Sequence, residues 1–222
     1  MIRSCLRVLM LAVCAIALPA LADGDLRDFA AQKNPAAANA PVILVLGDSL
    51  SAAYGVPLSQ GWVALLQQRL EQRGYPDRVV NASVSGETSA GGLRRLPELL
   101  DRHHPQFVLI ELGANDGLRG LPLPQLQANL RQMATAATNA GAQPIVFEMY
   151  IPTNYGVDYA DGFRASFHQV AGEMKLPLVP FFLGAIATDP SAFQDDGIHP
   201  NLQSQPKLLD AVWPTLEPLL KP

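Results

Sequence analysis

The chain has 222 residues, of which 49% are hydrophobic and 16% are charged, and its formal net charge is −4. This composition fits one compact domain with a sizeable core, and it excludes general disorder and two large domains. The negative charge and the lack of any lysine or arginine run argue against a nucleic-acid partner, which would require a basic face.

The first 22 residues have the pattern of a secretory signal peptide. Arg3 and Arg7 precede an apolar run over 8–18, and residues 20–22 (Ala-Leu-Ala) provide small side chains at the two positions that signal peptidase reads. The apolar run is about half of the ~20 residues that a membrane-spanning helix needs. We therefore expect cleavage after Ala22 and an exported protein, periplasmic or secreted, without a stable membrane anchor.

Both cysteines, Cys5 and Cys14, lie in this segment, so the mature chain is expected to have no disulfide and no thiolate metal site. A lipoprotein signal with cleavage before Cys14 is disfavoured, because Val13 is bulky where a small residue is expected. Loss of the two arginines in the segment moves the net charge from −4 to −6. Residues 23–40 have no clean period and are expected to form a mobile leader, so that the folded domain covers 41–222.

From residue 41 onward, apolar runs of strand length alternate with amphipathic stretches of helical length. The expected strands cover 42–46, 78–82, 107–112, 145–149 and 178–182. The expected helices cover 61–73, 92–102, 124–139, 161–174 and 202–220, the last with kinks at Pro206 and Pro214. This alternation predicts a parallel sheet covered on both faces, in a doubly wound α/β fold whose ligands bind at the carboxyl ends of the strands.

The first expected strand ends in a reactive turn. The apolar run over 42–46 stops at Gly47 and is followed by Asp48 and Ser49, so a buried parallel strand delivers an acid and a serine to the edge of the sheet. Taken alone, Asp48 or Ser49 could simply cap the next helix. Three further segments carry the other groups that a serine hydrolase needs, and Ser49 is therefore the candidate nucleophile.

Two of these segments can stabilise an oxyanion. The second strand leads into a loop of small residues with Gly86, whose backbone N–H can approach a substrate oxygen, although many turns need glycine only for a positive φ. The third strand leads into residues 113–117 (Gly-Ala-Asn-Asp-Gly). The amide of Asn115 can donate to a developing oxyanion, or it can only satisfy a turn.

The last segment, 195–201, follows the fifth strand after a loop and supplies a candidate general base. His199 suits this role near neutral pH, and Asp196 can reach its ring and fix its tautomer. Gly197 and Pro200 indicate a tightly fixed turn, which a catalytic histidine requires. The other histidines are expected to be structural: His103, His104 and His168.

In order and spacing these segments resemble the four blocks of the SGNH (GDSL) hydrolases, here residues 47–50, Gly86, 113–116 and 196–200. The resemblance implies a flavodoxin-like three-layer sandwich with a five-stranded parallel sheet of order 2-1-3-4-5. It also implies a catalytic triad and an oxyanion hole. The triad consists of Ser49, His199 and Asp196, and the hole of the N–H groups of Ser49 and Gly86 with the amide of Asn115.

Within that family the chain is most similar to the exported branch of acyl-CoA thioesterases, lysophospholipases and arylesterases, through residues 48–52 and 115–120. This implies hydrolysis of small-molecule esters or thioesters through an acyl-enzyme, without a metal or organic cofactor. Relatives often carry a second proline where this chain has Thr153, which bears on substrate fit. Two apolar loops, 117–122 and 150–155, are expected to bind the acyl chain through Leu118, Leu121, Ile151, Pro152 and Tyr155.

Other functions remain open at this point. A carbohydrate acetylesterase could use the same fold and groups, and a binding module without activity could have kept the fold. An α/β-hydrolase is disfavoured because the sequence has no Gly-x-Ser-x-Gly. A nucleotide-binding flavodoxin-like protein is disfavoured because there is no P-loop or Gly-x-Gly-x-x-Gly. The sequence does not predict the oligomeric state.

Overall fold

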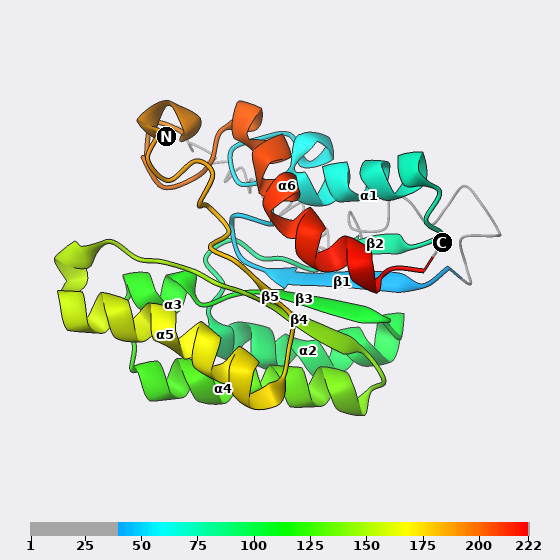
Figure 1. Ribbon diagram of the computed structural model, residues 1–222, viewed down its shortest axis with the longest axis horizontal. Coiled ribbons are helices and arrows are strands. Elements are labelled where there is room, and N and C mark those ends of the chain that lie inside the picture. The colour runs from blue at the N-terminus through cyan, green and yellow to red at the C-terminus, as the bar shows by residue number, and fades with distance from the viewer. Residues whose placement is uncertain (1–39, 222) are drawn as a thin grey trace, which may run out of the picture.

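The computed structural model describes residues 40–221 of the chain. The expected signal peptide (1–22) and the expected leader (23–40), apart from Ala40, lie outside these residues. A five-stranded parallel sheet of order β2-β1-β3-β4-β5 crosses the domain, with helices on both faces (Figure 1). The expected fold class and strand order are confirmed. Within the described residues no helix combines the length and the apolar character needed to cross a membrane.

The sheet is built on two central strands that are buried along their whole length. These are Val42–Gly47 (β1) and Phe107–Glu111 (β3), and they pair in register with Gly47 opposite Glu111. A strand that is buried on both faces has a continuous run of apolar residues, and this is why β1 and β3 could be predicted from the sequence. The outer strands are Arg78–Asn81 (β2), Gln143–Phe147 (β4) and Leu178–Val179 (β5).

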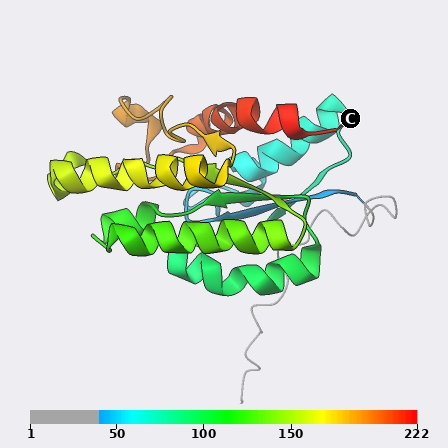
Figure 2. The same cartoon turned by 60° about the horizontal axis from the view of Figure 1, so that its bottom comes forward.

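The helices form a layer on each face of the sheet (Figures 1 and 2). Trp62–Arg73 (α1) and Gln205–Leu216 (α6) pack together on one face. The other face carries Ser89–His103 (α2), Leu123–Asn139 (α4) and Val157–Met174 (α5), with α4 packed against both neighbours. A five-residue helix, Ala114–Leu118 (α3), lies at the edge of the sheet where the strands end (Figure 1).

Aromatic side chains fill the space between the sheet and the α1–α6 layer. Trp62 is fully buried and contacts Phe147 and Phe182, with ring centroids 6.0 and 5.4 Å apart. Phe147 and Phe182 meet edge to face at 5.2 Å. Such tilted arrangements are the ones that aromatic quadrupoles favour, and they add to the stabilisation from burial.

Four elements begin earlier than the sequence indicated, among them β4, at Gln143 rather than at 145, and α4, at Leu123 rather than at 124. Helix α2 starts at Ser89 rather than at 92, because Thr88 caps it: its Oγ1 accepts a hydrogen bond from the backbone N–H of Gly91. Helix α5 starts at Val157 rather than at 161. Helix α3 lies where the sequence predicts a loop, because five residues are too few to show a helical period.

Two elements near the C-terminus are shorter than expected. Strand β5 ends at Val179 because Pro180 has no N–H for the ladder, and the N–H groups of Phe181 and Phe182 bond to Glu148 instead. The expected helix 202–220 is divided into a 3₁₀ turn at 202–204, helix α6, and a second 3₁₀ turn at 217–219. Pro206 lies in the first turn of α6, where a missing N–H is harmless, so it marks a helix start rather than the expected kink.

Candidate active site

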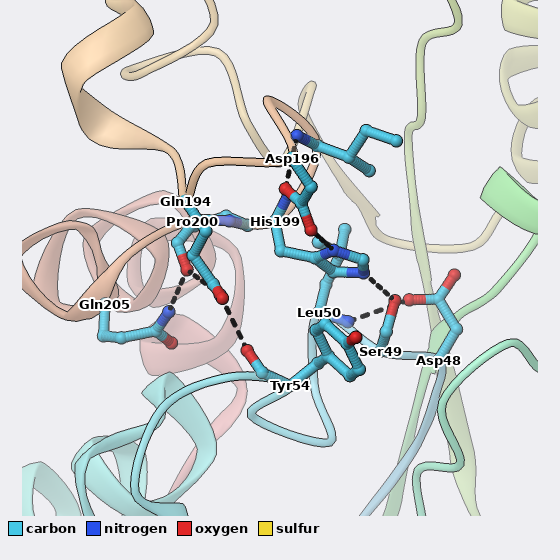
Figure 3. A network of polar contacts seen from close by, with 10 residues as sticks. Asp48, Ser49, Leu50, Tyr54, Gln194, Asp196, His199, Pro200 and Gln205 are labelled. Carbon is cyan, nitrogen blue, oxygen red and sulfur yellow. Dashed lines mark hydrogen bonds and ion pairs between the residues drawn. The ribbon is translucent and has the colours of Figure 1, made fainter.

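The turn after β1 brings Ser49 against a histidine that lies 150 residues further along the chain. Ser49 Oγ is 2.9 Å from His199 Nε2, and His199 Nδ1 is 2.7 Å from Asp196 Oδ2 (Figure 3). Because Asp196 faces Nδ1, that nitrogen carries the ring proton and Nε2 is free to accept the serine proton. A hydroxyl, an imidazole and a carboxylate thus lie in one line of hydrogen bonds.

Asp196 holds the histidine by its backbone as well as by its ring. Its Oδ1 accepts the backbone N–H groups of Ile198 and His199, both at 2.9 Å. These bonds, first that of the His199 backbone and then that of its ring, lower the pKa of Asp196 to about 2. Gly197 permits the turn with φ +66°. Asp196 is therefore ionised throughout the neutral range.

Tyr54 is a further member of the site that the sequence had not singled out. Its ring lies against the ring of His199, with centroids 4.4 Å apart, and half of its surface is exposed. Gln194 Nε2 donates to the carbonyl oxygens of Tyr54 and Pro200, so one side chain joins the nucleophile loop to the histidine loop (Figure 3). In the sequence, Tyr54 is only an aromatic residue five positions after the candidate nucleophile. Its contact with His199 could not be predicted, because it depends on how the two loops fold.

The Gly86 loop lies beside the end of β1. Val84 N–H donates to the carbonyl of Gly47 at 3.0 Å, and Gly86 has φ +76°, which only glycine adopts readily. Arg119 Nη2 donates to the carbonyl oxygen of Gly86 at 2.9 Å. The peptide on the C-terminal side of Gly86 is therefore held by a side chain from the segment that follows α3.

Asn115 lies in the first turn of α3, beside the same end of β1. Its Nδ2 donates to Asp48 Oδ2 at 3.0 Å, which leaves the second N–H of this amide for an incoming oxygen. Asp116, the next residue, accepts from both the backbone N–H and the hydroxyl of Ser89, at 2.8 and 2.5 Å. Because Ser89 begins α2, these bonds tie the Asn115 helix to the chain just after Gly86.

The expected acyl-binding residues divide into buried and exposed members. Ile151 is 8% exposed and belongs to the core, and a Cβ on Gly117 would lie only 2.7 Å from its Cγ2. The two expected acyl loops thus contact each other at this point. Leu118 and Leu121 are half-buried, whereas the two remaining expected residues are exposed at the surface: Pro152 and Tyr155.

Two of the remaining histidines, His168 and His104, have roles elsewhere in the fold. His168 Nε2 is 2.6 Å from Glu148 Oε1, which also accepts from Arg164, and His104 caps the C-terminus of α2 with φ +42°. In the part of the chain that the structure describes, no three side chains of histidine, cysteine, aspartate or glutamate are grouped so as to hold a metal ion.

The fold, with a serine, a histidine and an aspartate joined by hydrogen bonds at its edge, can be compared with known proteins. The chain belongs to the GDSL-like lipase/acylhydrolase family, whose model matches residues 45–205. It is 54% identical over 183 residues to Esterase TesA of Pseudomonas aeruginosa, covering 82% of this chain and 91% of that protein.

Two further relatives extend the comparison. The chain is 45% identical over 184 residues to a protein of Escherichia coli K12 named Thioesterase 1/protease 1/lysophospholipase L1, covering 83% of this chain and 87% of the relative. The crystal structure of the psychrotrophic esterase EstA from Pseudoalteromonas sp., inhibited by monoethylphosphonate, is 43% identical with a TM-score of 0.78. That match covers 80% of this chain and 97% of EstA. The chain is thus an ester hydrolase of the SGNH (GDSL) family.

Proposed function

We propose that this protein hydrolyses carboxylic esters and thioesters by a two-step acyl transfer through Ser49. The observation that carries the proposal is the 2.9 Å approach of Ser49 Oγ to His199 Nε2, with Asp196 on the other ring nitrogen. A serine hydroxyl at its ordinary pKa is a weak nucleophile, and an adjacent base that takes its proton makes it an effective one.

In the first step, Ser49 Oγ attacks the carbonyl carbon while His199 Nε2 takes the hydroxyl proton. The carbonyl oxygen becomes an oxyanion, which accepts hydrogen bonds from the N–H groups of Ser49 and Gly86 and from the amide of Asn115. The imidazolium is stabilised by ionised Asp196 and gives its proton to the departing alcohol or thiol. Water, activated by His199, then releases the acid from the acyl-enzyme and restores Ser49.

The substrates that we propose are acyl esters and thioesters of small molecules: aryl esters, acyl-CoA and lysophospholipids. The names of the relatives support this range, because one is an esterase and another is a thioesterase and lysophospholipase. The acyl chain would lie along the loops 117–122 and 150–155. Both loops contain apolar side chains and follow β3 and β4, whose carboxyl ends lie at the edge of the sheet where ligands bind in such folds.

A panel of p-nitrophenyl esters from acetate to palmitate, with an acyl-CoA and a lysophospholipid, tests this proposal. We expect turnover of esters and thioesters by the wild type and none by Ser49→Ala. A preference for acetyl groups on sugars would favour the carbohydrate acetylesterase. No turnover of any substrate would favour a binding module.

A substitution in the acyl loops tests chain recognition. Each methylene that is buried contributes about 0.8 kcal/mol, so Leu118→Asn should lower kcat/KM for octanoyl esters about tenfold or more relative to acetyl esters. Leu99→Asn is the matched control, since Leu99 is also half-buried against the core but lies on α2. Equal losses on both esters would mean that Leu118 supports the fold and does not contact the acyl chain.

We also propose that the protein is exported after cleavage following Ala22. The basic start, the short apolar run and the small residues at 20–22 support this. The mass of the protein recovered from the periplasm or medium should correspond to a chain that begins at Asp23. A mature protein that retains Cys14 would instead indicate a lipoprotein.

A further inference from the structure

Two carboxyl groups are buried directly behind the nucleophile, and the mechanism proposed above uses neither. Asp48 follows β1 and is 1% exposed, and Glu111 ends β3 and is fully buried. The two strands are paired so that Glu111 lies opposite Gly47, the residue before Asp48. Two ionised carboxylates cannot share such a site, because each would raise the cost of charging the other.

The surroundings of Glu111 do not suit a negative charge. Its Oε2 accepts from the hydroxyl of Ser51 at 2.5 Å and from the N–H of Asp48 at 3.3 Å, whereas its Oε1 has no hydrogen-bond partner among the described residues. Burial of an ionised carboxylate is strongly unfavourable when one of its oxygens accepts no hydrogen bond, and burial of the neutral acid costs much less. The packing is close, since a Cβ on Gly47 would lie 2.6 Å from Oε2.

The surroundings of Asp48 are different, because each of its oxygens faces a donor. Oδ1 accepts from the backbone N–H of Leu50 and Oδ2 from the amide of Asn115, both at 3.0 Å. Attraction to His199 also favours the charged form of Asp48. The donors therefore support a charge on Asp48 and leave Glu111 as the group that keeps a proton.

The titration of the two groups points the same way. Burial raises the pKa of Asp48 to about 6, against the opposing effect of its hydrogen bonds to Leu50 and Asn115. Burial, and then the charge of Asp48, raise the pKa of Glu111 well above its ordinary value. Of the two carboxyl groups, Asp48 is therefore the one that ionises more readily.

We propose that Asp48 and Glu111 hold one proton between them, that it resides on Glu111, and that the resulting Asp48 carboxylate orients the amide of Asn115. Asp48 and Glu111 are then positioning residues. The inference rests on the proposed role of Asn115 as an oxyanion donor. A carboxylate only accepts hydrogen bonds, so it must face the NH₂ end of this amide, and the second N–H then points toward the reacting carbonyl.

The location of the proton decides whether this arrangement holds. If Glu111 were ionised and Asp48 protonated, the O–H of Asp48 could donate to the amide oxygen of Asn115, and the NH₂ group could turn away from the oxyanion. The neutral state of Glu111 therefore secures the donor on Asn115, although Glu111 itself does not touch Asn115 in the hydrogen-bond pattern.

Two substitutions that preserve shape test the assignment by kinetics. Asp48→Asn removes the charge and permits the reversed amide, so kcat should fall by about 10²–10³, the loss that accompanies removal of one oxyanion donor, with KM little changed. Glu111→Gln preserves the neutral state, and its loss should be at least tenfold smaller. The proposal would be overturned if Asp48→Asn kept the kcat of wild type. It would also be overturned if Glu111→Gln lowered kcat as much as Asp48→Asn does.

Infrared spectroscopy tests the proton without any measurement of activity. At pH 8, wild type and Ser49→Ala should both show a carboxylic-acid carbonyl band that is absent from Glu111→Gln. Carbon-13 labelling of glutamate side-chain carboxyls in the wild type should shift this band, which gives the assignment even if a variant does not fold. The proposal fails if the band is absent, or if labelling of aspartate shifts it instead. Because the band does not depend on turnover, failure of the Ser49 mechanism would leave it unchanged.

Discussion

The ring of Tyr54 covers one face of the ring of His199, with centroids 4.4 Å apart and planes inclined by 38°. The contact joins the loop of the proposed nucleophile to the loop of the proposed base, and Gln194 holds the two loops together through the backbone. Half of the Tyr54 surface remains exposed to solvent.

We expect Tyr54→Ala to lower kcat/KM about tenfold, because an aromatic pair contributes roughly 0.5–1.5 kcal/mol beyond simple burial and its loss frees the histidine ring. Tyr54→Phe keeps the ring contact and should stay close to wild type. Steady-state kinetics on one ester are sufficient. A loss in Tyr54→Phe as large as in Tyr54→Ala would assign the effect to the hydroxyl.

Asp196→Asn should lower kcat about 10⁴-fold, the loss known for the corresponding change in a serine protease triad, because an amide supports the wrong tautomer of His199. Asp195→Asn is the matched control, since Asp195 is the exposed neighbour in the same turn. Its activity should be close to wild type. If Asp195→Asn were the inactive variant, the orienting carboxylate would be Asp195.

The low pKa of Asp196 predicts a change of stability in acid. Its pKa is about 2 in the folded protein and 3.8 in its ordinary state, so folding favours the ionised form. The resulting stabilisation is fully present above pH 4 and is lost as the pH falls through about 2. The free energy of unfolding, measured with urea, should be larger for wild type than for Asp196→Asn at pH 5. The difference in this free energy should become smaller toward pH 2. A difference that does not vary with pH would contradict this.

Gly47 and Gly172 should respond in opposite ways to substitution by alanine. A Cβ on Gly47 would lie 2.6 Å from Glu111 Oε2 and 2.7 Å from Ser51 Oγ, so Gly47→Ala should destabilise the fold by about 1–3 kcal/mol. A Cβ on Gly172, in α5, would have no atom within 4 Å, and Gly172→Ala should stabilise by about 0.5–1 kcal/mol through helix propensity. Chemical unfolding measures both. If Gly47→Ala were as stable as wild type, the Glu111 side chain would have to move aside to make room for the new Cβ.

The strand pattern alone predicts that the candidate groups at strand ends share one edge of the sheet. Ser49, Gly86 and Asn115 each follow an apolar strand, and the carboxyl ends of parallel strands lie at one edge of the sheet. The contact of Asp196 with His199 followed from their separation of three residues. These inferences needed only the strand pattern and local geometry.

Contacts that depend on packing between distant segments could not be predicted in this way. Glu111 appears in the sequence as a polar residue at a strand end, and its burial depends on Gly47 and Ser51, some 60 residues earlier. Ile151 appears as an apolar loop residue free to contact an acyl chain, whereas the structure packs it against Gly117. Tyr54 meets His199 only because two loops converge.

The central claim is that Ser49 is the nucleophile, and covalent labelling tests it most directly. A serine-directed organophosphonate added to the full, active protein should attach one equivalent, and peptide mass spectrometry should place it on Ser49. Ser49→Ala should fold as the wild type does and take up no label. Attachment to another residue in the wild type, or activity of Ser49→Ala within tenfold of wild type, would contradict the account.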